Sequence, residues 1–195
     1  MDYFSSDWHL GHRGIIEMTG RPFSSIEEMR ETILDNSIRK MKKGDNLFFL
    51  GDFSFDQKET ELALEEINRR KINFFWVKGN HDIKRIKKEY ETRYVRLHDT
   101  LIIKRNKKTI HMNHFPLIAW EKSFYNGFHL YGHVHNFSLE REELEKRMVG
   151  KNHNVNVEFN DYKPYSLDEI FSIMDTKGDN WDYTIFKEKG RISGD

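Results

Sequence analysis

Four apolar segments of the sequence each end in a short polar turn that contains His, Asp or Asn. The segments and their turns are residues 3–6 with Asp7 and His9, residues 47–50 with Asp52, residues 72–77 with Asn80, His81 and Asp82, and residues 128–131 with His133 and His135. Each apolar segment predicts a buried strand. Because polar groups at the carboxyl ends of strands in an α/β sheet converge on ligands, we expect the four turns to form one site.

The composition restricts what such a site can hold. The 195 residues include no cysteine, which excludes disulfides and thiolate ligands, so a metal ion would have to be bound by His, Asp, Glu or Asn. Basic and acidic residues balance at 32 each, which argues against electrostatic binding of nucleic acid or of a membrane. The N-terminus has no basic region followed by an apolar stretch, and no apolar run approaches the roughly 18 residues of a membrane span. We therefore expect a soluble, cytoplasmic protein.

The order of the expected elements predicts an α/β fold in a single domain, residues 1–195. Helices at 25–42 and 57–70 separate strands at 2–5, 46–50 and 72–77, and this alternation predicts parallel strands joined by right-handed crossovers. Closely spaced strand candidates at 94–97, 100–104 and 109–112 predict an antiparallel second half. The other expected elements are a short helix at 15–18, a solvated helix or charged excursion at 138–148, a strand at 153–159, a helix at 166–174 and a strand at 181–186.

The motifs in the four turns differ in specificity. Asp-x-His and Gly-Asp are common by chance, whereas all four motifs in this order are expected in fewer than roughly one in a thousand shuffled chains. With them the sequence resembles the calcineurin-like metallophosphoesterases, in particular their short single-domain bacterial and phage members. The resemblance spans residue 3 to about residue 135, and residues 161–170 are similar, less specifically, to the end of those short proteins. It implies a four-layer αββα sandwich of two mixed β-sheets flanked by helices.

The resemblance also implies a centre with two divalent transition-metal ions. One ion would be held by Asp7, His9, Asp52 and His135, and the other by Asp52, Asn80, His114 and His133, with Asp52 shared. Imidazole, carboxylate and amide ligands together suit Mn, Fe, Zn or Ni, with Mn preferred, and argue against Mg or Ca. His114 is favoured over His111 because Phe115-Pro116 follows it. A closed structural zinc site is disfavoured, because seven candidate ligands exceed the four that it needs.

The reaction implied by the resemblance is phosphoester hydrolysis by a hydroxide that the two ions activate, with Asp52 between them and His81 as the general acid. Many members have an Asp three residues after the shared Asp, where it supports this histidine, but here the position is Phe55. Asp56 and Asp82 remain alternative partners of His81. His12, Arg13 and Arg21 are candidate contacts of a substrate phosphate.

Three functions follow from these observations. The leading hypothesis is a phosphodiesterase or phosphatase that acts on a small, nucleotide-like phosphoester. A metal-dependent nuclease is the alternative, although the electrically neutral chain shows neither a capping domain nor a basic surface. A non-catalytic interaction module of the same fold is less favoured, because the candidate metal histidines and the histidine of Gly-Asn-His are all present. The sequence leaves the oligomeric state open.

Overall fold

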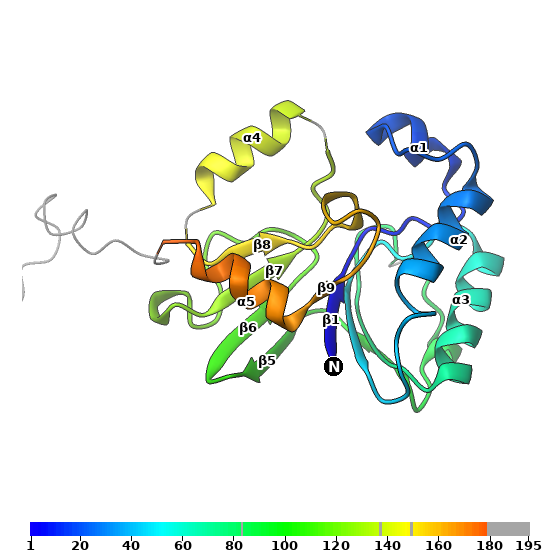
Figure 1. Cartoon of the computed structure of the whole chain (residues 1–195), viewed down its shortest axis with the longest axis horizontal. Helices are drawn as coiled ribbons and strands as arrows, with labels where there is room; N and C mark the ends of the chain where they lie inside the picture. The colour runs from blue at the N-terminus through cyan, green and yellow to red at the C-terminus, as the bar shows by residue number, and fades with distance from the viewer. Residues whose placement is uncertain (83, 137, 149, 179–195) are drawn as a thin grey trace, which may run out of the picture.

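Two mixed β-sheets pack face to face in this protein, as a computed structural model of residues 1–82, 84–136, 138–148 and 150–178 shows (Figure 1). The first sheet has the strand order β4-β3-β2-β1-β9 and the second the order β5-β6-β7-β8. The strands of the first sheet are β1 (Asp2–Ser5), β2 (Asn46–Leu50), β3 (Asn73–Val77), β4 (Val95–His98) and β9 (Tyr165–Ser166). Those of the second are β5 (Leu101–Arg105), β6 (Lys108–Met112), β7 (Phe128–Tyr131) and β8 (Asn152–Asn154).

Helices flank the two sheets. The α-helices are α1 (Arg13–Thr19), α2 (Ile26–Asn36), α3 (Gln57–Arg70), α4 (Ser138–Arg147) and α5 (Leu167–Asp175), and the 3-10 helices are η1 (Lys88–Tyr90), η2 (Ser123–Tyr125) and η3 (Val157–Phe159). Figure 1 shows α2 and α3 against the first sheet, whereas α4 and α5 lie on the side of the second. The predicted α/β sandwich of two mixed sheets with flanking helices is thereby confirmed.

The alternation of side chains along the strands creates two separate cores. In β2, Leu47 and Phe49 pack among the apolar side chains of α2 and α3. Phe48 and Leu50 point the other way and pack with residues of the second sheet, among them Phe128. Because successive residues of a strand face opposite sides, one apolar strand fills both cores. This burial on both faces explains the continuous apolar runs in the sequence.

The strand directions bring the polar turns together. β1, β2, β3 and β4 are parallel, so their carboxyl ends lie at one edge of the first sheet. In the second sheet, β6, β7 and β8 are also parallel. The turns that follow β1, β2, β3, β6 and β7 carry all seven predicted metal ligands.

The expectation of an antiparallel second half is therefore wrong in most of that half. Among the described strands of that half, β5 and β6 form an antiparallel pair and the short β9 joins β1 antiparallel, whereas the predicted strand at 94–97 is β4, which joins the first sheet in parallel. The segments 113–127 and 132–151 are long enough to return the chain for parallel pairing, although neither has the regular helical pattern of residues 57–70. Short spacing between strands was thus a poor guide to their direction.

Two element boundaries also differ from the expectation. The helix predicted at 25–42 ends at Asn36, yet Ile38 and Met41 are still buried because the following turns return them to the core. The strand predicted at 153–159 is divided into β8 and η3, where the Asn156 side chain accepts a hydrogen bond from the Glu158 amide. The strand predicted at 181–186 lies outside the described residues. No helix of the described part of the chain is long and apolar enough to cross a membrane.

Candidate metal centre

Several of the predicted ligands lie on backbone that L-residues rarely adopt. The φ angles of Asp7, His9, Asp52 and His133 are 57°, 52°, 58° and 67°, all in the left-handed region. Such a conformation costs roughly 1–2 kcal/mol per residue and persists where the surrounding structure enforces it. It turns the chain sharply after β1, β2 and β7 and aims polar side chains back over the ends of the strands.

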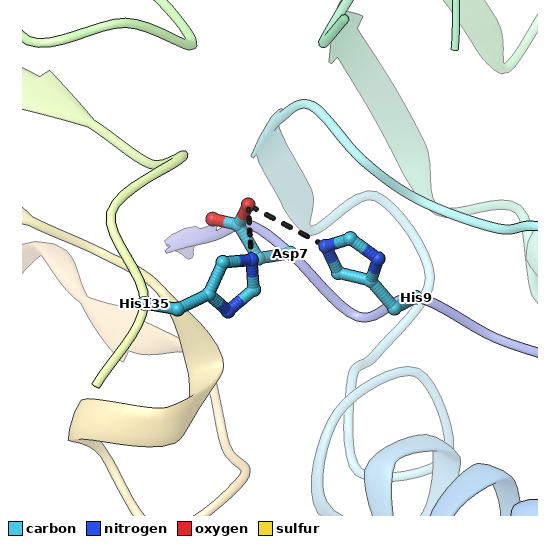
Figure 2. Close-up of side chains that lie close together, drawn as sticks. All are labelled: Asp7, His9 and His135. Carbon is cyan, nitrogen blue, oxygen red and sulfur yellow. Dashed lines mark ion pairs between the residues drawn. The ribbon is translucent and has the colours of Figure 1, made fainter. Parts of the chain in front are cut away.

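The first group of side chains consists of Asp7, His9 and His135, all buried (Figure 2). Asp7 Oδ1 lies 3.9 Å from His9 Nε2 and 3.8 Å from His135 Nε2. Figure 2 shows the carboxylate facing both rings, which come from distant parts of the chain. These ligand atoms lie within 4.8 Å of one another, a spacing that one ion can bridge.

The second group consists of Asp52, His114 and His133, with Asn80 beside it. His114 Nε2 lies 3.6 Å from Asp52 Oδ2 and 2.9 Å from Asn80 Oδ1. Asp52 Oδ2 also lies 3.6 Å from His9 Nε2 of the first group. The Asp52 carboxylate is therefore placed between the two groups, as a shared ligand would have to be.

Glycines allow the polar turns to approach one another this closely. A Cβ atom on Gly79 would overlap Asp52 Oδ1 and lie 2.6 Å from the Asp52 amide nitrogen. A Cβ atom on Gly132 would lie 2.5 Å from Asp7 Oδ2. Steric contact thus explains why glycine precedes Asn80 and His133, since any side chain there would displace a carboxylate of the site.

The donor and acceptor pattern fits bound cations. His9 Nε2 is buried and has no hydrogen-bond partner within the described structure. His114 Nδ1 lies 2.8 Å from the Leu50 carbonyl oxygen, which can only accept, so Nδ1 carries the proton of a neutral ring. His114 Nε2 then presents a lone pair to Asn80 Oδ1, another acceptor. A cation between these atoms would satisfy them, and this set of nitrogen and oxygen donors suits Mn, Fe, Zn or Ni.

The electrostatics of the first group agree with this arrangement. Burial lowers the pKa of His9 to about 4, against the opposing attraction of Asp7, so the ring is neutral and can act as a ligand. Burial alone would raise the pKa of Asp7, but the interaction with His9 and the attraction to His114 and His135 in their protonated forms hold it below its ordinary value. Burial alone would lower the pKa of His135, but its hydrogen bond to Glu158 and the charge of Asp7 raise it, so a cation bound by this ring would have to displace a proton, as metal binding to imidazole generally does.

Comparison with known proteins identifies the family of this chain. A sequence model of the family described as calcineurin-like phosphoesterase matches residues 3–189. The chain belongs to the calcineurin-like phosphoesterases. It is 29% identical over 175 residues to the uncharacterized protein MJ1445 of Methanocaldococcus jannaschii, a match that covers 89% of this chain and 90% of that protein. The crystal structure of AQ665, a protein of unknown function from Aquifex aeolicus, is similar with a TM-score of 0.70 and 29% identity, covering 89% of this chain and 98% of that one.

Membership of the calcineurin-like phosphoesterases implies metal-dependent hydrolysis of phosphoesters at a dinuclear centre. The structure brings together Asp7, His9, Asp52, Asn80, His114, His133 and His135, the seven predicted ligands. The assignment of each residue to one of the two ions stays a prediction. The close spacing of these side chains supports it.

Glu158 is a residue of the calcineurin-like centre that the sequence did not indicate. Its Oε1 atom lies 2.9 Å from His135 Nδ1, and the same carboxylate pairs with Arg21 at 2.8 Å. Burial would raise the pKa of Glu158, but its hydrogen bond to His135 and the charge of Arg21 lower it to about 2. The ionised carboxylate therefore fixes the His135 ring with Nε2 toward Asp7. No local motif could have revealed Glu158, because it stands 23 residues from the histidine that it contacts.

Asp82 also holds the centre together, but not in the way predicted. Its carboxylate accepts hydrogen bonds from the amides of Asp52, Phe53 and Gly79 and from Trp76 Nε1, at 2.8 to 3.1 Å. Burial raises its pKa to about 6, with the negative charge of Asp52 acting in the same direction. Asp82 thus ties the turns after β2 and β3 to each other.

His81 has no carboxylate partner of the kind that was expected. Asp82 is engaged as above, and the Asp56 side chain accepts from the Glu59 amide at the start of α3. Both alternatives for orienting His81 are therefore wrong. The nearest carboxylate oxygen within the described structure is Asp52 Oδ2, at 3.9 Å from His81 Nε2. The half-buried His81 ring packs instead on Phe55, with ring centroids 4.5 Å apart.

The three predicted substrate contacts lie at different distances from the site and in different environments. His12 lies in the site, with its Nδ1 atom 3.3 Å from His9 Nδ1. Arg13 is exposed at the start of α1 and does not line the cleft over the metal ligands. Arg21 is wrong as a substrate contact, because its fully buried guanidinium is used by the carbonyl oxygens of Asp7 and Trp8 and by Glu158. It instead supports the backbone of the first turn.

Proposed function

We propose that this protein is a dinuclear metal-dependent phosphoesterase, a phosphodiesterase or phosphatase, that acts on a small substrate. The observation that supports this most is the position of Asp52 Oδ2, at 3.6 Å from both His9 and His114, between two groups of metal-type ligands. A non-catalytic module would have no need of two adjacent ligand sets at a shared carboxylate. Divalent ions bound there would supply positive charge to the phosphate oxygens and would make a bound water more acidic, and so a better nucleophile.

The residues of the chain supply the remaining chemistry. Asp7, His9 and His135 would hold one ion, and Asn80, His114 and His133 would hold the other, with Asp52 shared. His81 follows the ligand Asn80, is half-buried, and lines the cleft above the ligands, so its ring can donate a proton to the leaving oxygen. The backbone amide of His81 also donates to Asp52 Oδ1 at 3.0 Å, which fixes this segment against the shared carboxylate.

The experiment is a hydrolysis assay with Mn²⁺, Ni²⁺ or Mg²⁺ added to metal-free protein, using bis(4-nitrophenyl) phosphate and 4-nitrophenyl phosphate. We expect activity with the transition metals, and the preferred ester then separates a phosphodiesterase from a phosphatase. His81→Ala should keep its metal content while kcat falls by roughly 10²- to 10⁴-fold, the usual contribution of a general acid. His98→Ala, a histidine of β4 outside the cleft, is the matched control. No hydrolysis of either ester under any metal would contradict the proposal.

A further inference from the structure

The cleft above the metal ligands has apolar walls. It has a volume of about 660 Å³, and its floor includes the imidazoles of His9, His133 and His135. Its walls are formed by Ile15 and Met18 of α1, Pro116 and Val134 of the loops after β6 and β7, and Leu144 of α4. Figure 1 shows α1 and α4 at the same end of the molecule, one beside each sheet. A group bound to the metal site would therefore extend between these two helices.

The walls also lack permanently charged side chains. Among the described residues that line the cleft, none is Lys, Arg, Asp or Glu. Arg21 is buried behind the first turn, and Arg13 borders a different surface depression, with Phe23 and Ile26. Beside the ligand imidazoles, the ionisable lining groups are His12 and His81, and His81 is assigned to the leaving oxygen, so a second anionic group of a substrate would find at most one imidazole as a partner, which is unfavourable. Met18 is 59% exposed and Leu144 is half-buried, so both have apolar surface to offer a ligand.

We propose that the substrate carries a single phosphate whose ester substituent is uncharged and apolar, an aryl or alkyl group bound between α1 and α4. This inference rests on the proposed function and narrows it, because polyphosphates and nucleic acids would bring further anions into a cleft whose described lining residues include no Lys or Arg. Burial of a ring-sized apolar group strengthens binding by roughly 10-fold or more.

Phosphonates test the inference without hydrolysis. Calorimetry on Mn²⁺-loaded protein and on metal-free protein would compare phenylphosphonate, methylphosphonate and carboxymethylphosphonate. We expect phenylphosphonate to bind at least about 10-fold more tightly than methylphosphonate, and the carboxymethyl compound to bind most weakly. Met18→Gln and Leu144→Gln should each reduce the preference for phenyl. Leu62→Gln, at a 44% exposed leucine of α3 outside the cleft, should leave the preference unchanged.

Equal binding of the phenyl and methyl compounds, tighter binding of the carboxymethyl compound, or no binding of any phosphonate would overturn the inference. Its failure is distinguishable from failure of the proposed function. Ester hydrolysis without preferential binding of phenylphosphonate would contradict only the apolar subsite. Preferential binding of phenylphosphonate without hydrolysis of any ester would support the subsite and contradict the enzymatic role.

A separate observation concerns the support of His81. The Phe55 ring is stacked on the His12 ring, with centroids 3.9 Å apart and an interplanar angle of 11°, and it contacts the His81 ring at 4.5 Å. The Arg85 guanidinium carbon lies 4.4 Å from the Phe55 centroid, and Arg85 Nη1 donates to the His81 carbonyl oxygen at 2.7 Å. Phe55 is thus held by a ring and a cation while it packs against His81.

From these contacts we infer that Phe55 is a positioning residue, which orients the His81 ring by packing in place of a hydrogen-bonded carboxylate. Asp56 and Asp82, the carboxylates nearest in sequence, have other partners. Loss of the Phe55 ring should leave His81 present but poorly aimed. The effect on catalysis should then depend on how much the leaving group needs a proton.

The test compares esters with different leaving groups. Phe55→Ala should lower kcat for an alkyl phosphoester, whose alkoxide must be protonated, at least about 10-fold more than for the 4-nitrophenyl ester. Phe55→Tyr, which keeps the ring, should restore both rates. In NMR spectra of the metal-free protein, the ring-current shift of the His81 carbon-bound protons should be lost in Phe55→Ala and kept in Phe55→Tyr. Equal losses for both esters, or unchanged His81 shifts, would overturn the inference.

Discussion

Asp7, His9, Asp52 and His133 hold the left-handed backbone conformation that the polar turns require. Glycine adopts this conformation without steric cost, yet glycine stands at none of the four positions. The backbone strain at these positions is therefore the cost of placing an Asp or His side chain in the site. In metal-free protein, these positions should therefore lower the free energy of unfolding relative to variants that have glycine there.

His133 offers a direct measurement of this strain, because it is exposed and because glycine and alanine both remove the ring that packs against His114 and Phe115. We predict that His133→Gly is more stable than His133→Ala by about 1 kcal/mol in metal-free protein, since only glycine is relaxed at a φ of 67°. Urea unfolding in the presence of a chelator gives the difference. The same pair of substitutions at the exposed Glu65, in the interior of α3, is the control, where Ala should be the more stable by about 1 kcal/mol. Equal stabilities at position 133 would show that the turn is not strained.

Glu158 should act through His135 on metal affinity. We predict that Glu158→Gln weakens the affinity for one ion by roughly 10- to 100-fold, because the neutral amide no longer fixes the imidazole that it contacts at 2.9 Å. Titration calorimetry with Mn²⁺ on protein first stripped of metal would detect the change. Glu17→Gln on the exposed side of α1 should leave both affinities intact. Unaltered binding in Glu158→Gln would mean that His135 is held by other groups.

At this scale the sequence predicted well which polar side chains lie close together, and predicted poorly the residues that support them. Asp7, His9 and Asp52 were predictable because each ends a strand in a recognisable motif. Glu158 has no motif, and its role arises only when the chain folds it against His135. Arg21 was misassigned because its forked guanidinium suits a substrate phosphate, whereas in the fold its N–H groups all find protein acceptors.

Among the elements, β7 carries a buried histidine outside the metal centre. His129 Nε2 accepts from the Leu117 amide at 3.0 Å, and Nδ1 lies 3.1 Å from the His111 carbonyl oxygen, so the ring is neutral with its proton on Nδ1. Burial lowers the pKa of His129 to about 4. The folded-state pKa is below the unfolded value of about 6.5, so the stabilisation is complete above that pH and is lost as the pH falls toward 4.

The predicted consequence is a steeper pH dependence in the wild type than in His129→Gln, which can donate and accept but does not titrate. Between about pH 7.5 and pH 5, the free energy of unfolding should fall by about 2 kcal/mol more in the wild type. Urea unfolding of both metal-free proteins at the two pH values gives the slopes, and their difference removes the contribution of the ligand histidines. Parallel slopes would show that His129 titrates normally in the folded state.

The elements themselves were predictable where local signals agreed. Ser166 and Glu169 form the capping box that begins α5, and α3 spans residues 57–70 as helical periodicity indicates. The parallel pairing of β6, β7 and β8 was not predictable, because the segments between them show little regular pattern before α4. Strand direction depends on where a crossover runs, and the spacing of short strands does not contain that information.

For the whole molecule, the two halves of the sandwich meet at the metal centre. Asp7, His9, Asp52 and Asn80 follow strands of the first sheet, whereas His114, His133 and His135 follow strands of the second. The sequence showed that these turns converge, but not that the division lies between two sheets. Ions bound here would therefore link the sheets to each other as well as serve the chemistry.

This placement predicts a large effect of metal on global stability. Ions that bind only the folded protein, at about 100 times their dissociation constant, add roughly 2.7 kcal/mol. For a chain of this size that corresponds to a rise in Tm of about 5–10 °C on adding Mn²⁺ to stripped protein. Asp52→Asn, which removes the shared carboxylate charge, should lose most of this rise. Asp35→Asn, at a 63% exposed side chain of α2, should keep it. Calorimetric scans with and without chelator measure this rise. An unchanged Tm on adding Mn²⁺ would mean that the two sheets are not joined through bound ions.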